Sequence, residues 1–343
     1  MSSILFILLY PFSILYNAVT AIRNLLFFIG VLPSKSFDVP IVSVGNLAVG
    51  GTGKTPMIEY LITVFSAKYK LAVLSRGYKR KTKGFLLVKQ NSTVAEVGDE
   101  PLQMKAKFPD AVFAVCEKRV IGVEQLLNQI PQLQLVLLDD AFQHRHILPR
   151  VQILLTDYSK LYIQDYLLPA GRLRENRRGA KRATIIIVTK CPPDLSKTKA
   201  LELEKMLRPT FQQKVFFTTM KYGSVYDSKS GNVILAPNIP QQIIACTAIA
   251  NPKPFYDQLQ SLGFTFIPMQ YPDHHFFTSK DEDAIMKRAK SKGVKTIITT
   301  EKDLVKLSAT SLVAFNIWVL PLSVAFLFNQ DEAFLNLLEK NIS

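Results

Sequence analysis

The sequence of 343 residues has few cysteines, no internal repeat and no low-complexity tract. Its three cysteines, Cys116, Cys191 and Cys246, lie far apart, form no Cys-x-x-Cys pair and are odd in number. This number and spacing of cysteines argue against the disulfide framework of a small secreted protein. They indicate a cytosolic protein whose cysteines are reduced. Apolar residues make up 48% of the chain, which excludes wholesale disorder and leaves enough material for two domain cores.

Acidic residues are scarce relative to basic ones. The chain has 27 Asp and Glu against 42 Lys and Arg, a net charge of +15. This excess favours an anionic partner, which includes nucleotide phosphates, an acidic membrane face, a phosphorylated substrate and nucleic acid. The basic residues are dispersed and no nucleic-acid-binding module is recognisable, so we expect no nucleic acid partner.

Charge is absent from residues 1–22, where "ILFILLYPFSILY" is apolar almost throughout. A secretory signal would need positive charge before the apolar run and a well-formed cleavage site after it, and neither is found. The segment could cross a bilayer, lie in its interface or form a core helix. A plain span is weakened by Pro11, which should kink a helix, and by the polar residues Ser13, Asn17 and Thr20. We expect membrane attachment, because an all-round apolar helix must otherwise be covered completely.

After Pro33, short β-rich runs alternate with helical stretches. Several of the runs are continuous in Val, Ile and Leu, as in strands buried on both faces of a parallel sheet. The expected strands are 40–46, 70–77, 85–89, 111–117, 133–140, 151–157 and 183–190, and the intervening helices are 54–68, 100–108 and 118–129. This alternation predicts a doubly wound α/β fold with a mostly parallel sheet.

The alternation pauses near Lys214. Two β-rich runs, "KVFFTTMKYGSV" and "NVILAP", flank a Ser-Gly-Asn turn and predict a two-stranded ribbon between two domains. Further strands and helices, the latter near 253–262, 281–291 and 330–340, predict a second, smaller α/β unit. The expected division is an apolar N-terminal helix (1–36), a larger α/β domain (37–213), the ribbon (214–236) and a C-terminal domain (237–343).

The stretch "NLAVGGTGKTP" lies between the first expected strand and the first expected helix of the larger domain. Its glycines free backbone N–H groups to face a phosphate, and the helix N-terminus adds positive charge, so strand, turn and helix together predict a P-loop. Ala48 occupies the leading glycine position, where a tight turn is needed and not phosphate contact. We expect the nucleotide to be held by Ala48, Val49, Gly50, Gly51, Thr52, Gly53, Lys54 and Thr55. Lys54 would reach the β- and γ-phosphates, and the Thr55 hydroxyl would ligate Mg²⁺.

A P-loop needs an acid at the end of a neighbouring strand to position its metal. "LQLVLLDD" supplies Asp139 and Asp140, either of which could hold Mg²⁺ directly or through water. His144 and His146 follow closely, but no cysteine or further histidine accompanies them, so we expect a structural or polar-network role for both. An acid near a histidine, for example Asp99 and His274, could activate a hydroxyl for phosphoryl transfer.

The set "GNLAVGGTGKTP", "SRGYKR", "GDEP", "LDDAFQHR", "LPAGRLRE", "PDHHFF" and "TEKD", in this order behind an apolar N-terminal helix, resembles the tetraacyldisaccharide 4'-kinase family. The resemblance runs over nearly the whole chain. It implies ATP- and Mg²⁺-dependent phosphorylation of the 4'-hydroxyl of a tetraacyl glucosamine disaccharide 1-phosphate, to form lipid IVA in lipid A biosynthesis. It also implies action at the cytoplasmic face of the inner membrane. The charge of +15 and the apolar N-terminus fit an anionic membrane surface as partner, and we expect no obligate protein partner.

The resemblance also assigns roles to residues. Lys54 and Thr55 match the family's P-loop lysine and hydroxyl residue. Asp99 of "GDEP" matches the proposed base, and the first histidine of "DHH", His274, matches its partner. Arg119, Arg174 and Glu175 match further residues of the family's active site.

Two other classes of protein compete with this interpretation. A regulatory GTPase would need a guanine-reading Asn-Lys-x-Asp motif after a strand, whereas "TKCP" has Pro192 where the aspartate should be. A nucleic-acid-dependent ATPase is suggested by charge alone. Neither accounts for the apolar N-terminus together with "PDHHFF".

Overall fold

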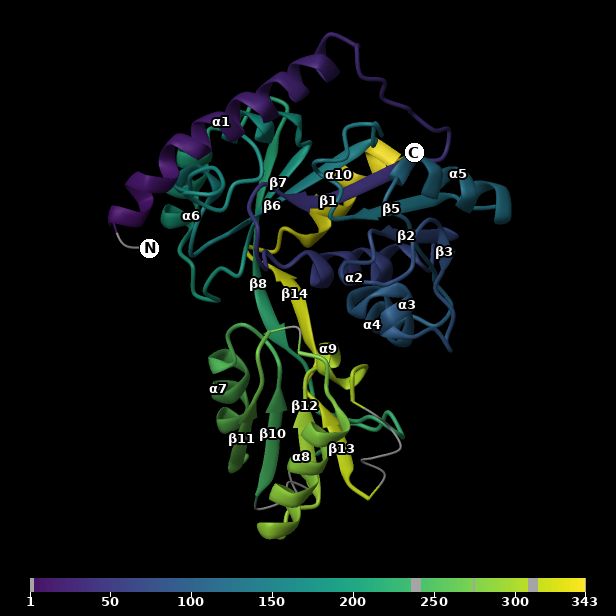
Figure 1. Cartoon of the computed structure of the whole chain (residues 1–343), viewed down its shortest axis with the longest axis vertical. Coiled ribbons are helices and arrows are strands. Elements are labelled where there is room, and N and C mark those ends of the chain that lie inside the picture. Colours follow the sequence, from purple (N-terminus) through teal and green to yellow (C-terminus); the bar gives the residue numbers. More distant parts are fainter. Residues whose placement is uncertain (1–2, 236–241, 274, 308–313, 343) are drawn as a thin grey trace.

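The computed structural model describes residues 3–235, 242–273, 275–307 and 314–342. Within them the chain forms two sheets, a nine-stranded sheet in the larger upper part of Figure 1 and a five-stranded sheet below it. The paired strands β8 and β14 run between the two parts (Figure 1).

The nine-stranded sheet carries the predicted fold. Its order is β14-β8-β7-β6-β1-β5-β2-β4-β3, and its seven inner strands run parallel while β3 and β14 pair antiparallel at the two edges. The strands are β1 (Ile41–Asn46), β2 (Leu71–Ser75), β3 (Leu86–Leu87), β4 (Val112–Val115), β5 (Leu135–Asp139), β6 (Val151–Asp157), β7 (Ile185–Thr189), β8 (Lys214–Tyr222) and β14 (Leu322–Phe326). The central strands β1, β5 and β7 are buried along their whole length, as expected for mostly apolar strands inside a parallel sheet.

Helices cover both faces of this sheet, which makes it doubly wound. On one face α2 (Lys54–Phe65), α4 (Asp99–Lys107) and α10 (Asp331–Ile342) share a core with β1, β5 and β6. On the other, α5 (Arg119–Gln129) packs near β2 and β5, and α6 (Lys197–Leu207) near β6 and β7. The remaining short helices of this part are α3 (Val94–Val97), η1 (Tyr162–Gln164) and η2 (Arg177–Arg182).

The smaller sheet has the order β11-β10-β12-β13-β9. Its strands are β9 (Tyr226–Asp227), β10 (Ile243–Thr247), β11 (Phe266–Gln270), β12 (Thr296–Thr299) and β13 (Asn316–Val319). Its helices are α7 (Lys253–Ser261), α8 (Ser279–Ser291) and α9 (Glu301–Leu304). The predicted second α/β unit is therefore present.

The predicted ribbon and the predicted end of the second unit differ from the structure. The Ser-Gly-Asn turn closes only a short hairpin, in which Asp227 N–H donates to Asn232 O (2.9 Å). The long ribbon instead pairs β8 with β14, with Tyr222 opposite Leu322, so residues 322–326 return to the first sheet. The helix α10 also packs into the first core and not into the second. Local turn chemistry identifies neighbouring partners, and it carries no information about a strand that lies about one hundred residues later.

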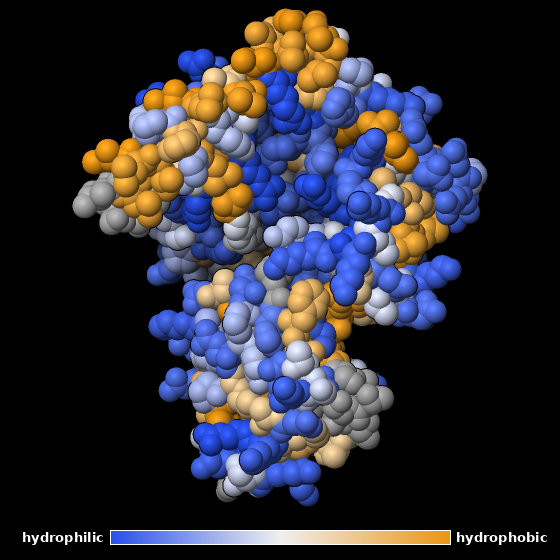
Figure 2. Space-filling model, viewed as in Figure 1, coloured by the Kyte–Doolittle hydropathy of each residue, from blue (hydrophilic) through white to orange (hydrophobic). Residues whose placement is uncertain are grey.

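The N-terminal helix α1 (Ser3–Phe28) lies diagonally across the larger part (Figure 1). Its polar groups face the protein: Ser13 Oγ donates to Leu167 O (3.0 Å), Tyr16 Oη to Arg174 O (2.8 Å) and Arg23 to Gln143 O (2.8 Å). Its opposite face is bare and forms an apolar band in Figure 2. The exposed apolar residues of this face are Leu5, Ile7, Leu8, Tyr10, Phe12, Ile14, Leu15, Val19, Ile22, Leu25 and Phe28. The helix is therefore not a core helix, although its length and composition would suffice to cross a membrane.

Candidate active site at the carboxyl edge of the large sheet

The glycine-rich loop joins β1 to α2 and has the conformation expected of a phosphate cradle. Gly50 and Gly53 have φ of 114° and 81°, a region that side chains rarely adopt, and a Cβ at Gly50 or Gly51 would meet open space. Asn46 Nδ2 donates to Thr52 Oγ1 (2.8 Å) and holds the loop's shape. The loop therefore leaves its concave side free in front of the α2 N-terminus.

The start of the loop is tied to the "LPAGRLRE" segment. Val49 N–H donates to Arg172 O (2.8 Å), and Ala48 forms an isolated bridge with Leu173. Ala48 itself is buried in the core under α6. The leading position of the loop is thus filled by packing, which explains why alanine suffices there.

The two aspartates after β5 are held differently. Asp139 is buried, and its Oδ2 accepts from Ser75 Oγ (3.1 Å), while its Oδ1 has no hydrogen-bond partner among the described residues. Burial, and then the charge of Asp140, raises the pKa of Asp139. Asp140 takes a left-handed φ of 46°, which turns its carboxylate toward Lys54 Nζ (3.8 Å) and Arg174 (3.0 Å to each oxygen). Although burial opposes it, the attraction of Lys54 and Arg174 lowers the pKa of Asp140.

Of the three further residues that the resemblance assigns, Arg119, Arg174 and Glu175, only Arg174 has its side chain on these acids. The guanidinium of Arg119 is buried and donates to the carbonyls of Cys116 (2.6 Å) and Asp139 (3.0 Å), so it braces the two strand ends from behind. Burial lowers the pKa of Arg119 to about 10. Glu175 pairs with Arg182 (2.7 Å) and accepts from Asn24 (3.0 Å), which ties α1 to the domain.

Asp99 stands at the first position of α4 and is buried. Its Oδ1 accepts from Glu100 N–H (3.0 Å), and its Oδ2 lies 3.5 Å from Nζ of Lys306, whose side chain is also buried. Lys306 follows α9 of the smaller part and lies 3.6 Å from Asp303 as well. The predicted partner of Asp99, His274, lies outside the described residues, so the predicted pair stays a prediction. A residue of the smaller part nevertheless reaches Asp99.

A second bridge between the two parts lies nearby. Lys107 Nζ donates to the buried Glu59 (2.7 Å) and to Glu301 of α9 (3.0 Å), and Gln103 donates to Glu59 (3.0 Å). None of these residues was predicted, because ion pairs between elements so far apart leave no local sequence signal. Glu301 lies in the "TEKD" motif, for which the sequence predicted no contact.

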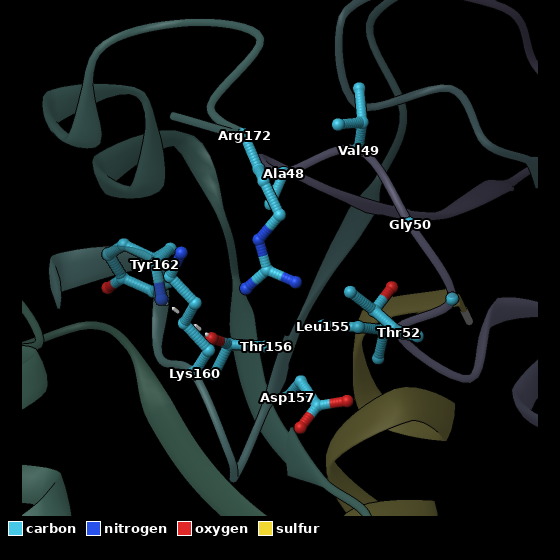
Figure 3. A pocket seen from close by; sticks show the side chains of 11 residues that line it. Ala48, Val49, Gly50, Thr52, Leu155, Thr156, Asp157, Lys160, Tyr162 and Arg172 are labelled. Carbon is cyan, nitrogen blue, oxygen red and sulfur yellow. Dashed lines mark hydrogen bonds between the residues drawn. The ribbon is translucent and has the colours of Figure 1, made fainter. Parts of the chain in front are cut away.

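Between the two parts lies a cavity of about 650 Å³. It is bounded by the loop, by Glu59, Glu100 and Gln103 of the larger part, and by Thr300, Glu301 and Lys302 of the smaller part. Its remaining wall is mostly apolar and includes Met220, Tyr222, Ile249, Pro254, Leu320 and Leu322. A separate small pocket opens on the other side of the loop, where Asp157, Lys160 and Arg172 lie near Val49, Gly50 and Thr52 (Figure 3).

The two histidines after Asp140 lie in different surroundings. Burial, then the charges of Arg119 and Arg76, lowers the pKa of His144 to about 4, so its ring is neutral. His146 Nδ1 lies 3.0 Å from Pro33 O, and its ring packs against Phe27. The residues of the described ranges contain no group of three or more His, Cys, Asp or Glu side chains that could hold a metal by themselves.

The acid next to Asp99 gives a first testable prediction. Burial, with the charges of Asp139 and Asp99, raises the pKa of Glu100 to about 7. Between its unfolded pKa and pH 7 the folded state keeps a proton that the unfolded chain releases, so this group's contribution to stability falls as the pH rises through that range. We expect Glu100→Gln to raise the free energy of unfolding by about 2 kcal/mol at pH 8 and to change it little at pH 4. Urea unfolding of both proteins at the two pH values checks this, and an equal effect at both would contradict it.

Comparison with known proteins identifies the family. The sequence profile of the tetraacyldisaccharide-1-P 4'-kinases (LpxK) matches residues 5–343. The chain belongs to this family. It is 44% identical to the tetraacyldisaccharide 4'-kinase of Flavobacterium johnsoniae over 98% of each chain, and 44% identical to that of Phocaeicola vulgatus over 95% of this chain and 92% of the relative. Its structure is similar to the solved structure of LpxK from Aquifex aeolicus in complex with ATP (TM-score 0.77, 28% identity, 97% and 98% of the two chains).

Proposed function

We propose that the protein transfers the γ-phosphoryl group of ATP to the 4'-hydroxyl of a tetraacyl glucosamine disaccharide 1-phosphate, the lipid A precursor. The observation that carries the proposal is the P-loop with Lys54 directed at the acidic end of β5, in a chain of this family. Phosphoryl transfer depends mainly on positioning and on charge stabilisation. Lys54 and the N–H groups of the loop hold the phosphates, and Arg174 neutralises charge beside them.

The residues present fit Mg²⁺. The cation usually binds one or two carboxylates together with substrate phosphates, which agrees with the lack of an all-protein cage in the described ranges. The Thr55 hydroxyl at the start of α2 and Asp139, whose buried Oδ1 lacks a partner there, would hold it, with Asp140 beside them. When bound, Mg²⁺ neutralises the charge that develops on the β- and γ-phosphates.

Asp99 is the proposed base for the sugar hydroxyl, with His274 as its partner. The proposal is supported by the resemblance and by the position of Asp99, which is buried near the cavity with its Oδ2 facing a lysine of the smaller part. Closure of the two parts around substrate would then exclude water from the reaction. In this scheme Arg119 and Glu175 keep in place the strand ends and loops that carry the other site residues.

The reaction is tested by incubating the protein with ATP, Mg²⁺ and the disaccharide 1-phosphate lipid in detergent micelles. We expect mass spectrometry to show one added phosphate on the lipid, and fragmentation to place it on the distal sugar. A phosphate on the lipid's existing 1-phosphate, or ATP hydrolysis with no lipid product, would contradict the proposed acceptor.

We further propose that α1 lies in the interface of the inner membrane, on its cytoplasmic face, and does not span the bilayer. Its polar side chains bond to the larger part through Ser13, Tyr16 and Arg23, and a span would have to break these contacts and bury their partners' polar groups in lipid. The opposite apolar face is free to enter the acyl region. The net charge of +15 adds attraction to anionic headgroups.

The membrane role predicts a difference between the two faces of α1. We expect Leu8→Glu with Leu15→Glu to weaken sedimentation with phosphatidylethanolamine–phosphatidylglycerol vesicles at least tenfold, because each change removes apolar burial and adds like charge to an anionic surface. Tyr16→Phe, on the docked face, serves as the control and should sediment as the unaltered protein does. Deletion of residues 1–30 should release more protein and lower activity on the lipid. Equal vesicle binding by all variants would contradict the proposal.

A further inference from the structure

The ends of strands β6 and β7 hold the P-loop from behind. Thr189 Oγ1 donates a hydrogen bond to Thr52 O (2.9 Å), and Lys190 Nζ donates one to Gly51 O. Lys190 Nζ also pairs with the Asp157 carboxylate at the end of β6 (2.9 Å). Lys190 has a φ of 56°, which residues with a side chain rarely adopt, so the surrounding structure enforces its position.

Lys190 is at the same time part of the wall of the 650 Å³ cavity. Because its ammonium group is held at Gly51 and Asp157, its four-carbon stem is fixed along the wall, and the side chain stays 40% exposed. A fixed alkyl stem is an apolar surface with a charged end. Apolar side chains of the ribbon, including Met220 and Leu322, line the same cavity.

The two sides of the P-loop differ in chemistry. Toward β5 lie Asp139, Asp140 and Arg174, which suit a metal ion and a phosphoryl group. Toward β7 and β8 lie the Lys190 stem and the apolar wall, which suit a planar base. A nucleotide whose phosphates lie on Lys54 therefore has its base on the β7 side.

We propose that Lys190 is a nucleotide-positioning residue, whose ammonium group clamps the carbonyl of Gly51 and whose alkyl stem is the surface on which the base of ATP packs. The inference rests on the proposed function, in that ATP is the phosphoryl donor. Two positions after Lys190, where a guanine-reading motif has its aspartate, stands Pro192, which has no carboxylate to accept hydrogen bonds from guanine. The site therefore holds the base by packing, and the residue at position 192 does not select guanine.

Two variants separate the clamp from the packing surface. Lys190→Met removes the ammonium group and keeps a stem, and Lys190→Ala removes both. Binding of Mg²⁺-ATP and of Mg²⁺-tripolyphosphate, which has no base, is measured by calorimetry for each. Lys199→Met and Lys199→Ala are the matched controls, since this lysine pairs with Glu202 (2.9 Å) on the surface of α6.

We expect both Lys190 variants to bind tripolyphosphate several-fold more weakly than the unaltered protein, and to the same extent, because both lose the clamp. For ATP we expect Lys190→Ala to be weaker than Lys190→Met by a further factor of about ten, as for the loss of one or two buried methylene groups. In the lipid phosphorylation assay, KM for ATP should rise while KM for the lipid stays unchanged, a split that a general loss of structure would not give. The Lys199 variants should match the unaltered protein.

Two results would overturn the inference, and a third would contradict only the proposed acceptor. Unchanged ATP affinity in both Lys190 variants would exclude any role. Equal loss for ATP and tripolyphosphate in Lys190→Ala would exclude the packing surface. The unaltered protein could also bind ATP normally, and the Lys190 variants show the expected losses, while no lipid is phosphorylated. That result would contradict the proposed acceptor and leave the Lys190 inference standing, so the failures of the two proposals are distinguishable.

Discussion

Replacing Lys54 with alanine is expected to abolish lipid phosphorylation, with a loss of at least a thousandfold in kcat/KM. In the proposed reaction Lys54 is the cation that the P-loop presents to the β- and γ-phosphates, and its charge would stabilise the transferring group. In the structure its Nζ lies 3.8 Å from Asp140, which holds the lysine at the acidic end of β5. Steady-state kinetics with ATP and the lipid substrate measure the loss.

The Lys54 variant should remain folded. Asp140 keeps its paired contacts with Arg174 (3.0 Å to each oxygen), so no buried carboxylate is left without a partner. Lys68→Ala is the matched control, because Lys68 follows the same helix and pairs with Glu339 at the surface. Near-normal turnover in a folded Lys54→Ala protein would refute the P-loop function.

Asp99→Asn is expected to lower kcat by about 10²–10⁴-fold while ATP affinity changes little. A sugar hydroxyl is a weak nucleophile, and a positioned base commonly contributes a factor of this size. The competing explanation is that Asp99 only caps α4, since its Oδ1 accepts from Glu100 N–H (3.0 Å). Asparagine keeps that acceptor, so capping alone predicts a nearly normal kcat.

Two comparisons strengthen the Asp99 test. Glu96→Gln, which alters an exposed acid in the capping box of α3 close to Asp99 in the chain, should leave kcat unchanged. If Asp99 and His274 act as one unit, the double variant Asp99→Asn with His274→Ala should lose little more than the worse single variant. Losses that simply multiply would show that the two residues act independently. Thermal denaturation must accompany the kinetics, because Asp99→Asn also weakens a buried pair with Lys306.

Sequence alone determined the features that are local in the chain. The apolar strand runs, the glycine-rich turn and the helix that begins at Lys54 were predictable because each is set by consecutive residues with one period or one turn chemistry. The order of the motifs also predicted the family, which the comparisons confirm, and with it the reaction class.

Only the tertiary structure decided how distant segments meet. It paired β8 with residues 322–326 where the sequence predicted a local ribbon, and it gave α1 one docked and one bare face where composition left three arrangements open. It also brought Lys306 to Asp99, and Lys190 to the back of Gly51, across gaps of many residues. Such contacts depend on which strand ends share an edge of the sheet and on which buried charges must find partners. These are properties of the packed chain, and no local pattern of residues encodes them.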